Sequence, residues 1–156
     1  MTLFAEEYQL ITGLDPVADA LAGTVSSDVV DAAEFDEIIF VCHVGVGVTG
    51  TSTLTVEACD DIVPTTTTAV AFFSRSYTAA NTEGAITART TSGYLTVAGS
   101  TRREICMVKG QTLASTGYRY VRLTAVEGTD SPVLGGILIL GRRKVQRALP
   151  AISAVD

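Results

Sequence analysis

The sequence predicts an all-β protein, an antiparallel β-sandwich or jelly-roll-like fold with at most one short helix near the N-terminus and an extended C-terminal arm. Two observations predict this class. Short runs rich in β-branched and aromatic residues recur at intervals of about ten residues, and Gly, Ser or Asp bounds each run. Several runs also alternate apolar and polar side chains with a period of two, which is typical of half-buried strands. The 156 residues are a length typical of one domain.

The N-terminal segment, 1–34, begins with a strand-like run at about 8–12. In the following "GLDPVADALAG", Asp15 can cap a helix, Pro16 suits a first helical position and Gly23 suits its end. One or two helical turns are therefore expected here, with a loop as the alternative. The weakly alternating run "TVSSDVVDAAEF" then leads into the next strand.

The run "FDEIIFVCHV" at 35–44 is apolar on both faces, which indicates a central strand covered on both sides. It leads into "HVGVGVTGTST", where Gly45, Gly47 and Gly50 have the G-x-G-x-x-G spacing of a dinucleotide-binding loop. Such a loop needs a helix after the last glycine, but 51–59 alternates with a period of two and is rich in Thr. We therefore interpret the glycines as a hairpin turn that pairs the two strands, without a bound cofactor.

More strands are expected along the rest of the chain. The loop "DDIVPTTTT" precedes a strand in "TTAVAFFSRSY", and the small polar residues of 78–92 form a longer excursion. Four later strands are expected in "SGYLTVAGS", "RREICMVKG", "YRYVRLTAVEG" and "VLGGILILG". In the third of these, Val121 and Leu123 predict a core side, and Tyr120 and Arg122 a more polar side. The run "GGILILG" has no polar side chain, so it lies either centrally or against a partner chain.

We expect a sandwich domain at 1–141, which includes the N-terminal segment, and a C-terminal arm at 142–156. Pro150 and the Ala/Ser composition leave the arm little to pack on its own, so an arm ordered against a neighbouring molecule is expected. A basic cluster in an otherwise acidic chain opens the arm and is the predicted contact to a partner, with a solvated tail as the alternative. The cluster comprises Arg142, Arg143, Lys144 and Arg147.

Charge and hydropathy exclude two classes of partner. The formal net charge of −6 argues against nucleic acid, because phosphate binding needs clustered Lys and Arg. No apolar run reaches the roughly 18 residues that span a membrane. The N-terminus has neither a cationic start nor a small-residue cleavage site, so we expect synthesis in a cytoplasm.

The three cysteines, Cys42, Cys59 and Cys106, predict buried reduced thiols, because their number is odd and their spacing wide. A zinc site would need the single histidine, His43, as its fourth ligand. Neighbours in a strand point to opposite faces, so Cys42 and His43 would diverge. The run "EACDD" could contribute oxygens to a calcium ion, but EF-hand spacing is absent. We predict no metal and no cofactor.

No catalytic residue is predicted. His43 is expected in a central strand rather than in a Ser-His-Asp triad, and the sequence has no GxSxG, HExxH or P-loop motif. Three adjacent carboxylate pairs are better explained by solvation of strand ends than by a glycosidase. They are Glu6 and Glu7, Asp36 and Glu37, and Asp60 and Asp61. A glycan platform would have to use the tyrosines, because Trp is absent. Those available are Tyr77, Tyr94, Tyr118 and Tyr120.

Three stretches carry a resemblance to a known family: "IIFVCHVGVGVTGTSTLTVEACDD", "TTTTAVAFFSRS" and "GYRYVRLTAVEGTDSPVLGGILIL" with the following "GRR". Over 35–143 the chain resembles small β-sandwich proteins encoded in tailed-phage structural gene clusters, often beside the major capsid gene. The shared features are compositional, and no catalytic residue carries over.

The resemblance implies a component of the virion, a decoration or cement protein seated on the outer capsid surface. Its partner would be the major capsid protein, and it would form a homo-oligomer, with a trimer expected because decoration proteins often occupy threefold sites. A tail or neck component and a host-glycan-binding adhesin are the alternatives. In each case the protein acts by binding rather than by catalysis.

Overall fold

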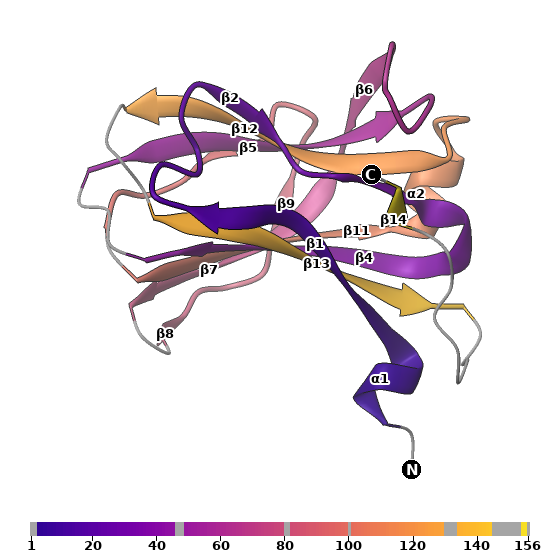
Figure 1. Cartoon of the computed structure of the whole chain (residues 1–156), viewed down its shortest axis with the longest axis horizontal. Coiled ribbons are helices and arrows are strands. Elements are labelled where there is room, and N and C mark those ends of the chain that lie inside the picture. Colours follow the sequence, from indigo (N-terminus) through magenta and orange to yellow (C-terminus); the bar gives the residue numbers. More distant parts are fainter. Residues whose placement is uncertain are drawn as a thin grey trace.

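In the computed structural model, antiparallel strands form two sheets that pack face to face, β5 and β12 above β4 and β13 in the view of Figure 1. The structure describes residues 3–45, 49–79, 82–99, 101–129, 134–144 and 154–155. The predicted class, an all-β antiparallel sandwich, is confirmed. Among the described residues, no helix has the length and apolar character needed to cross a bilayer.

Sheet A has the order β1-β13-β4-β11-β7-β8, with β9 also paired to β7. Its strands are β1 (Tyr8–Val17), β4 (Phe35–Val44), β7 (Phe72–Ala79), β8 (Thr82–Glu83), β9 (Thr87–Arg89), β11 (Arg102–Lys109) and β13 (Gly135–Arg143). Sheet B has the order β10-β5-β12-β3-β14, with β2 on β12 and β6 on β5. Its strands are β2 (Thr24–Ser26), β3 (Val29–Asp31), β5 (Thr51–Cys59), β6 (Thr67–Val70), β10 (Tyr94–Leu95), β12 (Tyr120–Thr129) and β14 (Ala154–Val155).

The core lies between the sheets and follows from the period-two alternation of the long strands. Every second residue is buried at 38–44 in β4, at 52–58 in β5 and at 121–125 in β12. The innermost side chains include Phe40 from β4, Leu54 and Val56 from β5, and Leu123 from β12. The predicted core side of β12 is confirmed, because Val121 and Leu123 are buried whereas Tyr120 and Arg122 are partly exposed.

The connection after β4 is not a hairpin, so that prediction is wrong. β4 pairs with β11 and β13 in sheet A, whereas β5 pairs with β12, β10 and β6 in sheet B. β4 and β5 each have one continuous apolar side. These two sides face each other across the core, so the strands lie in different sheets instead of pairing in one. Gly47 lies outside the described residues. The expected strand in 67–77 also divides, into β6 of sheet B and β7 of sheet A.

The helix expected at 15–23 is absent. β1 continues through Asp15 and Pro16 to Val17, and a turn follows, so the loop alternative is correct only after Val17. A proline is tolerated there because β1 is an edge strand, and its pairing with β13 is irregular between Leu14 and Val17. The helical turns are α1 (Phe4–Glu7), the 3₁₀ turn η1 (Ala32–Glu34) and α2 (Gly110–Ala114).

The last long strand extends into the segment predicted as the C-terminal arm, 142–156. β13 continues past Gly141, the last residue of the predicted sandwich domain, through Arg143, and it lies inside sheet A between β1 and β4. The run "GGILILG" therefore takes a central position in sheet A, with Ile137 and Ile139 in the core and Leu138 and Leu140 on the outer face. Further on, β14 pairs with β3 of the same chain, Ala154 opposite Val30.

Candidate functional site

The outer face of sheet A is apolar, although it looks away from the core. In β4, Ile38, Phe40 and Cys42 point inward, so Ile39 and Val41 point outward. No strand or helix that the structure describes packs across this outer face (Figure 1). The expectation that 35–44 is covered on both sides is thus met on only one side within the described chain.

The strand register aligns outward apolar side chains across the whole sheet. Leu10 of β1 lies opposite Leu140 of β13, which lies opposite Ile39 of β4. Ile39 in turn is opposite Met107 of β11, and Met107 is opposite Phe73 of β7. One residue from each of five strands therefore forms a continuous apolar row.

A second row lies beside the first. It contains Leu138, Val41 and Ile105 in register, with Thr12 and Arg75 at its two ends. The apolar side chains of both rows form what we call the apolar belt. The apolar belt consists of Leu10, Ile39, Val41, Phe73, Ile105, Met107, Leu138 and Leu140.

Side chains of the belt remain open to solvent. Leu10 is 60% exposed, Phe73 46% and Leu138 43%, while the members between them are half-buried by their lateral neighbours. Strand spacing of about 4.8 Å and a same-face repeat of about 7 Å give the belt an area of roughly 250–300 Å². The largest apolar patch on a typical monomer covers about 300–600 Å² and is often functional, and the belt reaches the lower end of this range.

A charged row borders the belt on one side. Tyr8, Arg142, Glu37 and Lys109 are in register across β1, β13, β4 and β11. The guanidinium of Arg142 lies 3.8 Å from the carboxylate of Glu37, and both side chains are partly exposed. This row gives the belt a polar rim, which is the arrangement of many protein-protein interfaces.

A second charged group borders the belt on the other side. Arg103 lies opposite both His43 and Tyr77, and its guanidinium is 4.9 Å from the centre of the Tyr77 ring. The carboxylate of Glu83 accepts hydrogen bonds from Arg75, at 3.1 Å, and from the Tyr77 hydroxyl, at 3.0 Å. Around the belt the described side chains thus include more Lys and Arg than Asp and Glu, on a chain of net charge −6.

A pocket of about 360 Å³ opens where the belt meets the far end of β1. We call it the β1 pocket. Its lining is Thr12, Leu14, Asp15, Pro16, His43, Gly45, Leu134, Gly135, Gly136, Ile137 and Leu138. Only His43 and Asp15 carry ionisable side chains, so the pocket suits a large apolar group. Leu138 and Thr12 belong to both the pocket and the second row, which makes the two surfaces continuous.

Three residues of the predicted basic cluster gather at the end of β13, where they hold neighbouring segments. Arg142 pairs with Glu37 and faces the outer side. Arg143 donates to the Ala5 carbonyl at 3.3 Å. Lys144 Nζ donates to the Ala33 carbonyl at 2.8 Å. Arg147 lies outside the described residues.

A buried polar network, which the sequence analysis missed, lies between the sheets. The Glu104 carboxylate accepts hydrogen bonds from Ser76 Oγ and, at 3.0 Å, from the Tyr94 hydroxyl. Arg102 lies 3.5 Å from the same carboxylate, and both charged side chains are almost fully buried. The signal was present in β11, where alternation places Arg102 and Glu104 on the same side as Cys106. The network fastens β11 to β7 and β10.

The cysteines are free and buried, as predicted. Burial raises the pKa of the Cys42 thiol to about 12 and that of Cys59 to about 11, so neither is a ready nucleophile. His43 is exposed on the outer face of sheet A, opposite to Cys42. The described residues contain no group of three or more His, Cys, Asp or Glu side chains able to hold a metal ion.

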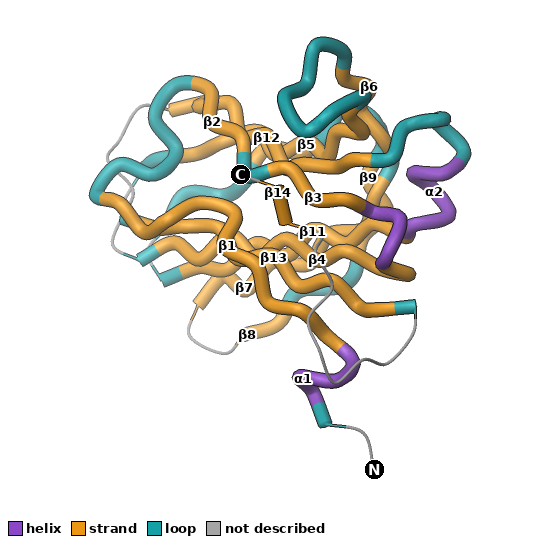
Figure 2. The backbone as a smooth tube through the Cα atoms, turned by 45° about the vertical axis from the view of Figure 1, so that its right-hand side comes forward, coloured by secondary structure: helices purple, strands orange, loops and turns teal. Residues whose placement is uncertain are grey.

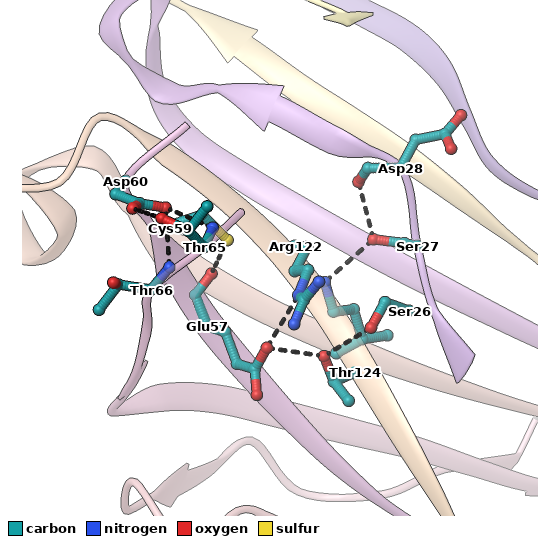
Figure 3. Close-up of polar contacts among 11 residues, drawn as sticks. Ser26, Ser27, Asp28, Glu57, Cys59, Asp60, Thr65, Thr66, Arg122 and Thr124 are labelled. Carbon is teal, nitrogen blue, oxygen red and sulfur yellow. Dashed lines mark hydrogen bonds and ion pairs between the residues drawn. The ribbon is translucent and has the colours of Figure 1, made fainter. Parts of the chain in front are cut away.

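The carboxylate pairs serve local structure in the described chain. Asp60 accepts hydrogen bonds from Thr65 and Thr66 and closes the loop between β5 and β6 (Figure 3). Glu6 accepts from the Leu3 amide and caps α1. The tyrosines form no shared platform: Tyr94 is buried on Glu104, whereas Tyr77 lies under Arg103 on the outer face.

Comparison of the sequence and the structure with known proteins returns no matching family model, curated protein or solved structure.

Proposed function

We propose that the protein is a structural component of a phage virion, a decoration protein that binds the outer surface of the head through the apolar belt. The observation that carries the proposal is the belt itself. A sheet face with two aligned apolar rows and a charged rim loses free energy by leaving water, which favours a protein partner. The resemblance over 35–143 supplies the kind of partner, the major capsid protein.

The size of the surface supports stable attachment. The belt and its two bordering rows cover roughly 650 Å² at ordinary strand spacing. A standard interface buries about 800 Å² on each partner, so this face alone provides most of one. On a symmetric shell the same contact repeats at every equivalent position. A decoration protein that bridges neighbouring capsomers would then stabilise the shell by burial of surface rather than by chemistry.

The charges around the belt favour a partner of the opposite sign. Arg103, Arg142 and Lys109 lie beside the belt. Glu37 is opposite both Arg142 and Lys109, so these two cations share one carboxylate, whereas Arg103 stacks on Tyr77. We infer that the complementary surface of the major capsid protein is apolar with acidic residues at its edge. Such complementarity sets the orientation of docking and raises the association rate.

A charged substitution in the belt tests this proposal. Phe73 lies in the belt and is 46% exposed, and Val126 on sheet B is 44% exposed, so Phe73→Asp and Val126→Asp form a matched pair. We expect Phe73→Asp to weaken binding to purified heads at least about tenfold, because it places a charge within an apolar contact. Val126→Asp should bind as the wild type does. Co-sedimentation with heads, with melting temperature as the folding control, gives the measurement.

The number of copies on the particle separates the head from the tail. A gel of purified particles gives the ratio of this protein to the major capsid protein. A ratio near the number of capsomers supports decoration, whereas a few copies per particle would place the protein in the tail or neck.

The belt experiment has a contradicting outcome of its own. Equal head binding by Phe73→Asp and Val126→Asp would overturn the role of the belt.

A further inference from the structure

The N-terminal helical turn exposes apolar side chains away from the sandwich. α1 projects from the start of β1 with the N-terminus at its tip (Figure 2). Leu3 and Phe4 are each 58% exposed, although the Phe4 ring stacks on Tyr8 with 5.1 Å between ring centres. The helical turn is nevertheless ordered by its own contacts: Glu6 accepts from the Leu3 amide, and Arg143 donates to the Ala5 carbonyl.

The β1 pocket lies at the opposite end of the same strand. α1 joins β1 at Tyr8, whereas Leu14 and Pro16 of β1 line the pocket. Six to eight residues of strand separate them, a distance of roughly 20–26 Å. Because α1 continues directly into an extended Tyr8, it cannot fold back into the pocket of its own chain. Leu3 and Phe4 can therefore enter a β1 pocket only on another copy of the chain.

We propose that Leu3 and Phe4 of one copy of this chain fill the β1 pocket of a second copy. The inserted pair is apolar, and so are Leu14, Pro16 and Leu134 around the pocket. The contact is head-to-tail, because each copy uses one end of β1 as donor and the other as acceptor. Repetition of such a contact closes into a ring when the rotation between copies allows it.

Charge supports this occupant. Glu6 and Glu7 follow the inserted residues on α1 and would arrive with them. On the receiving side, His43 lines the pocket and Arg103 lies opposite it in the next strand. Asp15 is the acidic member of the lining, on the side of β1. Arg103 lies one strand beyond His43 and Asp15 lies on the opposite side, so an acidic helical turn that faces Arg103 gives the contact a preferred orientation.

This contact overlaps the surface of the proposed function only at its edge, through Leu138 of the belt and through His43 and Arg103 beside it. Apart from Leu138, the members of the belt do not line the pocket, and neither Leu3 nor Phe4 belongs to the belt. A copy could therefore bind the head through the belt and a neighbouring copy through α1. Phe73 lies at the end of the belt away from the pocket, so a substitution there tests the head contact without changing the contact between copies.

The mass of the full-length chain in solution tests the proposal, measured by analytical ultracentrifugation over a range of concentrations. We expect a closed oligomer for the wild type. A donor variant, Leu3→Ser with Phe4→Ser, should weaken self-association at least about tenfold. An acceptor variant, Leu134→Asp, should do the same, and His43→Trp, which fills the pocket, is a second acceptor variant. Val63→Ser, at an exposed apolar residue of the β5–β6 loop, is the control and should keep the wild-type mass.

Mixing the variants distinguishes this contact from a symmetric one. The donor variant keeps an intact pocket and the acceptor variant keeps an intact α1, so a mixture should form a complex of one copy of each and nothing larger. A wild-type mass for both variants, no association in the mixture, or a monomeric wild type would each overturn the proposal. If Phe73→Asp loses head binding but keeps the oligomer, the proposed function and this contact are confirmed as separate.

Discussion

On the outer face of sheet B, polar side chains bond to one another, whereas on the outer face of sheet A apolar side chains stand in rows open to solvent. Figure 3 shows the first arrangement: Glu57 accepts from Arg122 at 2.8 Å and from Thr124 at 2.9 Å, and Thr124 lies 3.1 Å from Ser26. These groups come from β5, β12 and β2, and they satisfy one another within the chain.

The contrast between the two outer faces is the reason that our proposal places the partner on sheet A. Both sheets contribute their inner faces to one core, so neither outer face is needed to bury the core. A polar outer face such as that of sheet B is compatible with water. The apolar belt of sheet A has no cover in the described part of the chain, and it is the face on which our proposal places a partner. The same contrast separates the residues on which folding depends from those on which binding depends.

The substitution with the largest expected effect lies in the buried polar network between the two sheets. It tests whether the stability of the fold depends on that network. Glu104→Ala should remove the carboxylate that Arg102 and Tyr94 share and leave the Arg102 charge buried without its partner. Loss of one partner of a buried ion pair costs about 3–5 kcal/mol. Urea denaturation should therefore show a much lower midpoint.

A control keeps this test specific. The double variant Arg102→Met with Glu104→Leu removes both charges and should recover much of the stability. If Glu104→Ala unfolds at the wild-type urea concentration, the buried network contributes little to the stability of the fold.

One substitution on each outer face compares how much the two faces contribute to the free energy of unfolding. Glu57→Ala leaves Arg122 and Thr124 of sheet B without their acceptor, so we expect a loss of about 1–2 kcal/mol in the free energy of unfolding. Leu10→Thr in the belt should change it by less than about 0.5 kcal/mol, because the side chain is largely exposed. Urea denaturation measures both. A larger loss for Leu10→Thr than for Glu57→Ala would show that the belt serves folding rather than binding.

Much of the fold follows from the sequence because period-two alternation depends on local residue choice. The strands near β1, β4, β5, β11, β12 and β13 were predicted from this pattern. The assignment of strands to the two sheets was not predicted. An apolar strand face can be buried whether consecutive strands pair in one sheet or face each other across the core. The predicted hairpin after β4 failed for this reason. Pro16 suggested a helix start, but its place at a sheet edge decides its structure.

The candidate site was harder to predict for the same physical reason. The run at 35–44 was correctly interpreted as apolar on both faces, yet the belt exists only because the register aligns Ile39 with residues from four other strands. Register depends on long-range pairing, which a single sequence does not reveal. The basic cluster drew attention because charge is visible in sequence. Of its described members, Arg142 borders the belt, whereas Lys144 holds η1.

The smallest expected effect concerns an ion pair at the rim of sheet B. Burial alone would raise the pKa of Asp31, but hydrogen bonds from Arg119 and from the Ala33 amide outweigh burial and lower it below the ordinary value. A carboxyl with a lower pKa in the folded state stabilises the protein above its unfolded pKa of about 3.9 and loses this contribution as the pH falls through the folded value. Because the Arg119 side chain is largely exposed, the contribution is small. Between pH 5 and pH 2, the urea midpoint of Asp31→Asn should therefore fall less steeply than that of the wild type, and Arg119→Ala should reproduce most of the difference. Parallel midpoints for all three proteins would show that this ion pair adds nothing, and the polar face of sheet B would then owe its stability to Glu57 and its partners.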